Sequence, residues 1–289
     1  MDIVHAGSMD WGENLAAHRH GGMAHKLLFE GKEGSPDNYA LVLANESAEY
    51  YSPRHRHCWD QVRFCLEGSV PIGPNLAVDA GEAAYFPEGV AYGPQEGGPD
   101  RIELLLQFGG ASGQGYLSAA QLRRARAELA HEGTFERGVF RRTSGNGKKN
   151  EDAYEAIWRH VTGKPIDYSK PRYKAPIIMR ADAFAWTDVA RAPGVKRKSL
   201  GVFPDRGLEL DLLALSQGAR FDMAASRALK LVFVRAGEGT CDHQPYFAQS
   251  TIRLQPGEHP PLVSATLTEL FVISVAPVLG RESASSNGP

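Results

Sequence analysis

The sequence is short of cysteine and has no long apolar run. Its 289 residues include three cysteines, Cys58, Cys65 and Cys241, which form no CxxC pair. This excludes a disulfide framework and predicts a reduced protein. No apolar stretch approaches the ~18 residues that a membrane helix needs. The first residues, MDIVHAGSMDWGEN, have neither a basic start nor an apolar core. We therefore expect no signal peptide, no membrane partner and a cytoplasmic location.

A large excess of charge of either sign is also missing. The formal net charge is −2, which argues against nucleic acid as a partner because phosphate binding needs a concentrated basic surface. The short basic run KRK at 196–198 is interpreted as a solvated loop. The glycines of GGASGQG at 109–115 follow no GxGxxG order, and the sequence has no P-loop or nucleophile elbow. We expect no nucleotide cofactor.

The sequence does contain two groups of short β-like runs around a helical segment. Residues 26–110 alternate apolar and polar positions between Gly, Pro, Asn and Asp turns, which predicts an antiparallel barrel or sandwich. Helices are expected between Ser118 and Gly133 and over 151–161, with RRTSGNGKKN (141–150) as a flexible loop. The β pattern then returns. The predicted division is an exposed arm (1–25), a first barrel (26–110), a helical insertion and linker (111–174), a second barrel (175–280) and a disordered tail (281–289).

The stretch PRHRHCWDQVRFCLEG (53–68) places two histidines two residues apart at the start of a predicted strand. Residues i and i+2 of a strand point to the same face, so His55 and His57 project together at a spacing suited to two cis ligands of one metal ion. His18 and His20 repeat this spacing, but nothing around them indicates a strand with a following turn. An exposed arm is the better interpretation of that second pair.

Two stretches, 53–68 and 81–92, resemble the two cupin motifs, G-x5-H-x-H-x3-E-x6-G and G-x5-P-x-G-x2-H. The residues that match at the fixed spacings are His55, His57, Gly68, Gly81, Pro87 and Gly89. Two positions depart from the motifs: Gln61 stands where glutamate is usual, and Tyr92 stands where the third histidine is usual. The resemblance implies an all-β protein with a helical insertion, built from two cupin (double-stranded β-helix, jelly-roll) barrels in tandem.

The second half resembles the motifs only weakly. When Gly237 is matched to Gly68, Lys230 corresponds to Gln61, and Ala224 and Ser226 correspond to the two histidines. We therefore expect a degenerate second barrel without a ligand set. The resemblance implies a structural role for it, in which it stabilises the first barrel or supplies the surface of a homodimer.

The resemblance also implies one divalent transition metal (Fe, Mn, Ni, Cu or Zn) in the first barrel. Its ligands would be His55, His57, Gln61 and Tyr92. A neutral amide is a weak ligand, and a phenol, with a free pKa of about 10, must lose its proton to bind well. The alternative is a metal-free barrel in which the two histidines are polar lining of the mouth.

The remaining candidate residues describe a substrate site. Arg63 continues the inward alternation, and it would either hold a substrate carboxylate bidentately or form a salt bridge with an internal acid such as Glu103. Trp59 and Tyr85, with Phe86, are expected as aromatic walls, and Tyr92 is also a candidate general acid or base. Cys65 is interpreted as a small buried hydrophobic residue.

These observations leave three hypotheses for function. The first is a metal-dependent enzyme of the dioxygenase, isomerase or lyase type acting on a small, anionic organic acid. The second is a metal-free protein that binds or senses a metabolite, and the third is a structural or oligomeric role. The first is favoured because both histidines, Gln61 and Arg63 occur together in one half only. Fold resemblance alone does not choose between the reactions that cupins carry out.

Overall fold

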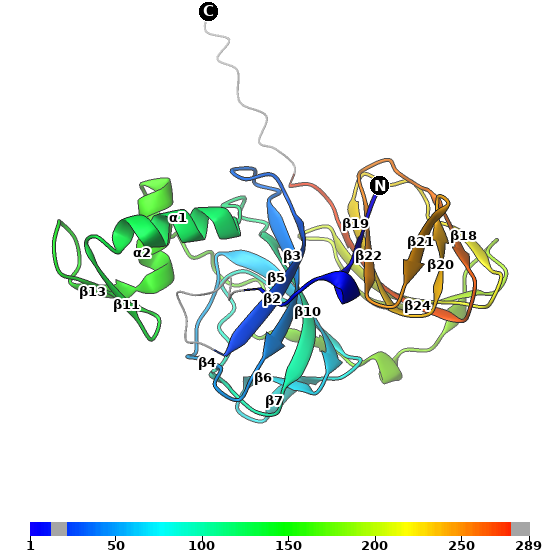
Figure 1. The fold of residues 1–289 in the computed structure, drawn as a ribbon, viewed down its shortest axis with the longest axis horizontal. Coiled ribbons are helices and arrows are strands. Elements are labelled where there is room, and N and C mark those ends of the chain that lie inside the picture. Colours follow the sequence, from blue (N-terminus) through cyan, green and yellow to red (C-terminus); the bar gives the residue numbers. More distant parts are fainter. Residues whose placement is uncertain (13–21, 279–289) are drawn as a thin grey trace, which may run out of the picture.

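The computed structural model describes residues 1–12 and 22–278, and it contains two β-barrels and a helical insertion (Figure 1). Figure 1 shows the insertion at one end of the molecule, the first barrel in the middle and the second barrel at the other end. No helix in the described ranges is long and apolar enough to cross a membrane. The predicted tail, 281–289, lies outside the described residues.

The first barrel is built on a six-stranded antiparallel sheet with the order β14-β8-β5-β10-β3-β2. Its strands are β2 (Met23–Glu30), β3 (Tyr39–Glu46), β5 (Trp59–Glu67), β8 (Ala83–Phe86), β10 (Arg101–Gly109) and β14 (Ile177–Met179). Two small sheets complete it, formed by β4 (Tyr51–Ser52) with β9 (Gln95–Glu96) and by β6 (Ser69–Gly73) with β7 (Leu76–Asp79). The glycine that ends the first motif, Gly68, has a φ of 77°, a value that L side chains rarely adopt.

The second barrel has a seven-stranded sheet with the order β1-β22-β19-β24-β17-β16-β15 and a four-stranded sheet with the order β18-β23-β20-β21. The first sheet contains β1 (Asp2–His5), β15 (Thr187–Asp188), β16 (Val195–Phe203), β17 (Leu208–Leu215), β19 (Leu229–Ala236), β22 (Ser250–Leu254) and β24 (Thr268–Val275). The second contains β18 (Arg220–Asp222), β20 (Glu238–Cys241), β21 (Gln244–Phe247) and β23 (Pro261–Ser264). Short 3-10 helices, η1 (Ala6–Ser8) and η2 (Ala181–Ala183), flank the sheets.

The two barrels exchange their first strands. β1 pairs antiparallel with β22 of the second barrel, from Asp2 opposite Arg253 to His5 opposite Ser250. β14 pairs with β8 of the first barrel. Two of the boundaries expected from the sequence are therefore corrected. Residues 2–5 belong to the second barrel and not to an exposed arm. The strand at 177–179 belongs to the first barrel, so the second barrel does not begin at 175. These pairings join residues far apart in the chain, so local pattern does not indicate them.

Alternation along the central strands divides the side chains between two cores. On β5, Val62 and Phe64 face the second barrel, where Phe64 stacks on Phe271 of β24 with ring centroids 4.4 Å apart. The neighbouring positions on β5, including Gln61 and Arg63, face the interior of the first barrel. The interior of the second barrel is a packed apolar cluster of aliphatic side chains with Cys241 and Tyr246.

The insertion contains more β-structure than its sequence suggests. Its helices are α1 (Ala119–Leu129) and α2 (Ala153–Thr162), and its small sheet consists of β11 (Gly133–Glu136), β12 (Val139–Arg142) and β13 (Asn150–Asp152). Ser118 caps α1 as expected, in a capping box with Gln121. The expected flexible loop over 141–150 is corrected, because both of its ends pair in the sheet. The helices pack on the first barrel through an apolar cluster that includes Trp59 and Leu122.

Candidate active site

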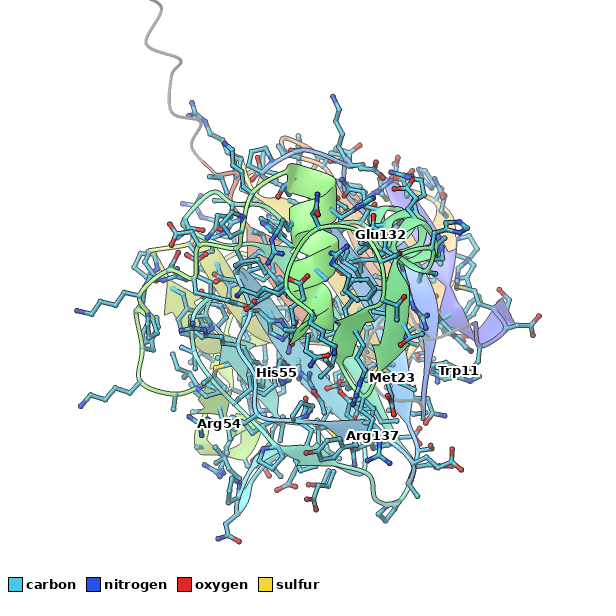
Figure 2. All side chains as sticks on the ribbon, turned by 90° about the vertical axis from the view of Figure 1, so that its left-hand side faces the viewer. Trp11, Met23, Arg54, His55, Glu132 and Arg137 are labelled. Carbon is cyan, nitrogen blue, oxygen red and sulfur yellow. The ribbon has the colours of Figure 1, made fainter. Side chains whose placement is uncertain are left out.

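A cavity of ≈ 70 Å³ lies inside the first barrel and opens toward the insertion. The interior faces of β2, β3, β5 and β10 form its walls, and Tyr116, Ala119, Leu122 and Tyr154 from the insertion cover it. Figure 2 views the molecule from the side that carries the insertion, with His55 and Met23 of the barrel labelled; both line the cavity. A cavity of this size has room for a few water molecules or a small ligand.

Three of the four predicted metal ligands meet at the wall of this cavity. His55 Nε2 lies 3.1 Å and His57 Nε2 lies 2.7 Å from the hydroxyl of Tyr92. A pair of backbone hydrogen bonds between His55 and Tyr92 fixes this arrangement, since each residue donates its N–H to the carbonyl of the other. The two sequence motifs are thus joined at this point.

The orientation of the His55 ring is set by its other nitrogen. Nδ1 lies 2.7 Å from the carbonyl oxygen of Pro53, so Nδ1 carries the proton and donates it to that carbonyl. Nε2 therefore presents its lone pair toward the Tyr92 hydroxyl. A backbone partner for the second ring nitrogen is the usual way in which proteins orient a histidine that binds a metal.

The separations of these donor atoms suit one metal ion. Two ligands at ~2.1 Å from an ion and at right angles to each other are about 3.0 Å apart. The two distances from the Tyr92 hydroxyl to the imidazole nitrogens are close to this value. The chemistry of the set is less complete, because no group of three or more His, Cys, Asp or Glu side chains in the described ranges is arranged to hold a metal. Two imidazoles and one phenol oxygen are therefore the donors that fit an ion here.

Gln61, the fourth predicted ligand, is in contact with Arg63 and Gln107. Its amide nitrogen lies 3.5 Å from the Tyr92 hydroxyl in one orientation. In the orientation that satisfies more neighbours, its oxygen accepts from Arg63 Nε at 2.6 Å and from Nη2 at 3.2 Å. In that orientation the oxygen occupies the amide position that faces both Arg63 and the Tyr92 hydroxyl. Its amide also lies 3.0 Å from the Gln107 amide on β10.

Arg63 lies on the cavity wall and is also part of a buried ion network. Its Nη1 is 3.1 Å from Glu103 Oε1 and 3.8 Å from Glu46 Oε1, and Arg101 pairs with the second oxygen of Glu46. All four side chains are buried. Burial raises the pKa of Glu103, and the nearby Glu46 adds to this effect, against the opposing charges of Arg63 and Arg101. Of the two alternatives predicted for Arg63, the salt bridge with Glu103 is thus present in the structure.

Trp59 forms an aromatic wall of the cavity with residues from the insertion. Its ring is 4.1 Å from the His57 ring and 4.8 Å from that of Tyr154, measured between centroids. Its indole nitrogen is buried and has no hydrogen-bond partner in the described parts of the chain. An unpaired buried N–H is costly, so this donor is available to an acceptor atom of a ligand in the cavity.

Tyr85, predicted as a second aromatic wall, does not line the cavity. It pairs with Val62 across β8 and β5 and faces the second barrel, where its ring packs against Phe203. Its hydroxyl donates to Asp60 at 2.6 Å and accepts from Arg172 at 2.9 Å. The prediction is corrected for a simple reason: Tyr85 and Phe86 are adjacent on a strand and point to opposite faces.

The buried thiol of Cys65 has no catalytic setting. Its sulfur contacts the carbonyl oxygens of Glu67 and Gly68, and burial raises its pKa to about 12. Sequence reasoning missed the cavity residues of the insertion, because their approach to the barrel leaves no local pattern. It also missed Gln107, although this residue lies directly opposite Gln61 on β10. The rival pair, His18 and His20, lies outside the described residues.

No protein-family model and no curated protein matches this chain significantly. Solved structures do match over nearly its whole length. A proposed dioxygenase from Nostoc punctiforme aligns with a TM-score of 0.61 at 12% identity, over 98% of this chain and 84% of the other. A Streptomyces albus enzyme, HEPD, solved with 2-hydroxyethylphosphonate and Fe(II), gives 0.55 at 12% identity, over 97% and 77%.

A variant of oxalate decarboxylase from Bacillus subtilis gives a TM-score of 0.53 at 13% identity, over 95% of this chain and 77% of the other. These similar structures are cupin-fold proteins. At such identities the likeness concerns the fold, and it agrees with the antiparallel sheets and two barrels described above. The chain has the tandem cupin fold with a helical insertion in its middle.

Proposed function

We propose that the first barrel is the active site of a cupin-type, metal-dependent enzyme that acts on a small organic acid. The observation that carries this proposal is the convergence of His55 Nε2 and His57 Nε2 on the Tyr92 hydroxyl, at separations that suit cis ligands of one ion. Among similar folds, HEPD was solved with Fe(II) and with a small phosphonate substrate. The Fe(II) of HEPD supports a divalent metal, and its phosphonate substrate supports a small anion as the substrate class.

The ion would be held by His55, His57 and Tyr92, with Gln61 as the fourth candidate. When bound, a divalent metal supplies Lewis acidity and open positions for water, oxygen or substrate. Tyr92 would either ligate the ion through its phenol oxygen or, unligated beside it, act as a general acid or base toward the substrate. The other contacts of this site serve to bind and shield the substrate.

Two groups of this chain would hold the substrate beside that centre. The unpaired indole N–H of Trp59 offers a hydrogen bond to an acceptor atom. Arg63 supplies a cation whose charge is shared with Glu103, so a substrate carboxylate would compete with that side chain for it. Ala119 and Leu122 of the insertion add apolar surface to the cavity, and a less polar surrounding would strengthen both interactions.

A metal-free binding protein is the second candidate, and the setting of Gln61 favours it. Its amide oxygen is turned toward Arg63, and no described carboxylate joins the two histidines. In this case the histidines and Tyr92 form a hydrogen-bonded polar wall, and the cavity holds a small metabolite without reaction.

Elemental analysis separates the two candidates. The full chain is purified without a histidine tag or a chelator, beside His57→Ala and a matched control, His259→Ala, whose exposed ring lies in the second barrel. The enzyme proposal predicts about one equivalent of iron, manganese, nickel, copper or zinc, lost only in His57→Ala. The same metal content in all three proteins would show that His57 is not a ligand, and no metal even after reconstitution would favour the binding protein.

A further inference from the structure

A second cavity of ≈ 450 Å³ lies between the two barrels, away from the histidines. Residues of the first barrel, including Lys32, Asp37 and Phe108, form one side, and residues of the second barrel, including Arg206 and Gln255, form the other. Its volume falls within the range of ~300–1,000 Å³ that is typical of small-molecule sites. Much of its lining is apolar, contributed by leucine, valine, proline and phenylalanine side chains.

Arg206 is a buried cation on the wall of this cavity, with 5% of its surface exposed. Its Nε donates to the carbonyl oxygen of Gly109 at 2.7 Å, and its Nη1 donates to that of Ala276 at 2.6 Å. Both acceptors are neutral. A buried charge is stable only when it is compensated, so these two hydrogen bonds leave part of the cost unmet.

Carboxylates near Arg206 compensate it only in part. The closest contact in the described ranges is to Asp37, 3.9 Å from Nη2, and Asp37 also accepts from the backbone N–H of Val278. Burial lowers the pKa of Arg206 in spite of the charges of Asp60 and Asp37. The N–H groups of Nη2 have no hydrogen-bond acceptor among the described residues.

The other charged residues of the lining do not neutralise the remaining positive charge of Arg206. Arg253 is paired with Asp2 through two nitrogens, at 3.0 and 2.7 Å. Glu30 directs a carboxylate oxygen to the N–H of Ala119, at the start of α1. Lys32 is exposed on the first barrel and adds a second positive charge. The cavity therefore combines a guanidinium that is only partly compensated with an apolar floor.

We propose that this cavity is a second binding site, for a small organic anion with an apolar body, such as a carboxylate or a phosphate monoester. The anionic group accepts hydrogen bonds from Arg206 Nη2, and the apolar body packs against the floor formed by both barrels. Because each barrel supplies part of the lining, a bound anion also stabilises the contact between them. This inference does not depend on the function proposed for the first barrel.

Calorimetric titration of the full chain with benzoate, phenyl phosphate and inorganic phosphate tests the proposal. Gln255→Glu places a negative charge at the rim through an exposed side chain, and Gln244→Glu makes the same change on the same barrel outside this lining. We expect saturable binding of at least one aromatic anion, weakened about tenfold by Gln255→Glu. Binding should be unchanged in Gln244→Glu and in His57→Ala, which alters only the first cavity.

Three outcomes would overturn the proposal. The first is no saturable binding of any of the three anions to the unmodified chain. The second is binding that is lost in His57→Ala and retained in Gln255→Glu, which would place the anion in the first barrel. The third is inorganic phosphate binding as tightly as phenyl phosphate, since the apolar floor would then contribute nothing. Preference for benzoate or for phenyl phosphate would identify the anionic group.

Discussion

At the scale of single residues, the buried acid Glu103 controls how the charge of Arg63 is shared. Burial raises its pKa above the ordinary value of 4.5. Above pH 4.5, Glu103 therefore holds its proton more often in the folded protein than in the unfolded chain. The contribution of this group to the free energy of unfolding is full below pH 4.5 and is lost as the pH rises through the raised pKa.

Replacing Glu103 by Gln removes this dependence on pH. We expect the free energy of unfolding of Glu103→Gln to vary less steeply with pH above 4.5 than that of the unmodified chain, because the amide does not titrate. Urea unfolding at a series of pH values measures both slopes. Glu238→Gln, at an exposed position, is the control and should keep the original slope. Equal slopes for Glu103→Gln and this control would contradict the assignment.

Tyr85 provides a second residue-scale test, because it lies beside the first barrel's site without facing it. Tyr85→Phe loses two hydrogen bonds, to Asp60 and from Arg172, both of which are charged groups. We expect a loss of about 1.5–3 kcal/mol in the free energy of unfolding and no change in metal content. Tyr51→Phe, at an exposed position, should change neither quantity. Loss of metal in Tyr85→Phe alone would show that Tyr85 serves the site after all.

At the scale of elements, the insertion depends on the ends of its helices. Gly163 ends α2 with a φ of 71°, and a Cβ added there would meet nothing within 4 Å. Gly163→Ala should therefore cost about 1 kcal/mol through backbone strain alone. Gly7→Ala is the matched control, since it also has open space and lacks the positive φ. Thermal unfolding compares the two variants, and equal stability would refute this explanation.

The sequence predicts elements well where pattern is local. Alternation places Trp59, Gln61 and Arg63 on one face of β5, and the structure brings them together on the cavity wall. The sequence also predicts Ser118 as the residue that caps α1, and the structure confirms it. The same rule was misapplied to Tyr85, whose neighbour Phe86 occupies the inner face. Tyr116 and Tyr154 were not foreseen, because contact between the insertion and the barrel is set by tertiary packing.

At the scale of the whole molecule, the exchanged strands tie the barrels together. β1 supplies an edge strand to the second barrel, and Ala6, directly after it, is fully buried between the barrels. Removing residues 1–8 should expose β22 and lower the free energy of unfolding by at least ~3 kcal/mol, from the apolar surface of Ile3, Val4 and Ala6. Urea unfolding measures this loss. Unchanged stability would mean that β1 does not hold the second barrel.

The central claim is that His55, His57 and Tyr92 hold one metal ion in the first barrel. Binding of Co(II) to the metal-depleted chain, followed by its visible absorption spectrum, tests this claim most directly. We predict saturation at about one equivalent, with affinity lowered by more than the roughly 10- to 100-fold that loss of a ligand's hydrogen-bond partner costs in His55→Ala, and a changed spectrum in Tyr92→Phe. Absence of saturable binding, or identical titrations and spectra for all three proteins, would contradict the claim.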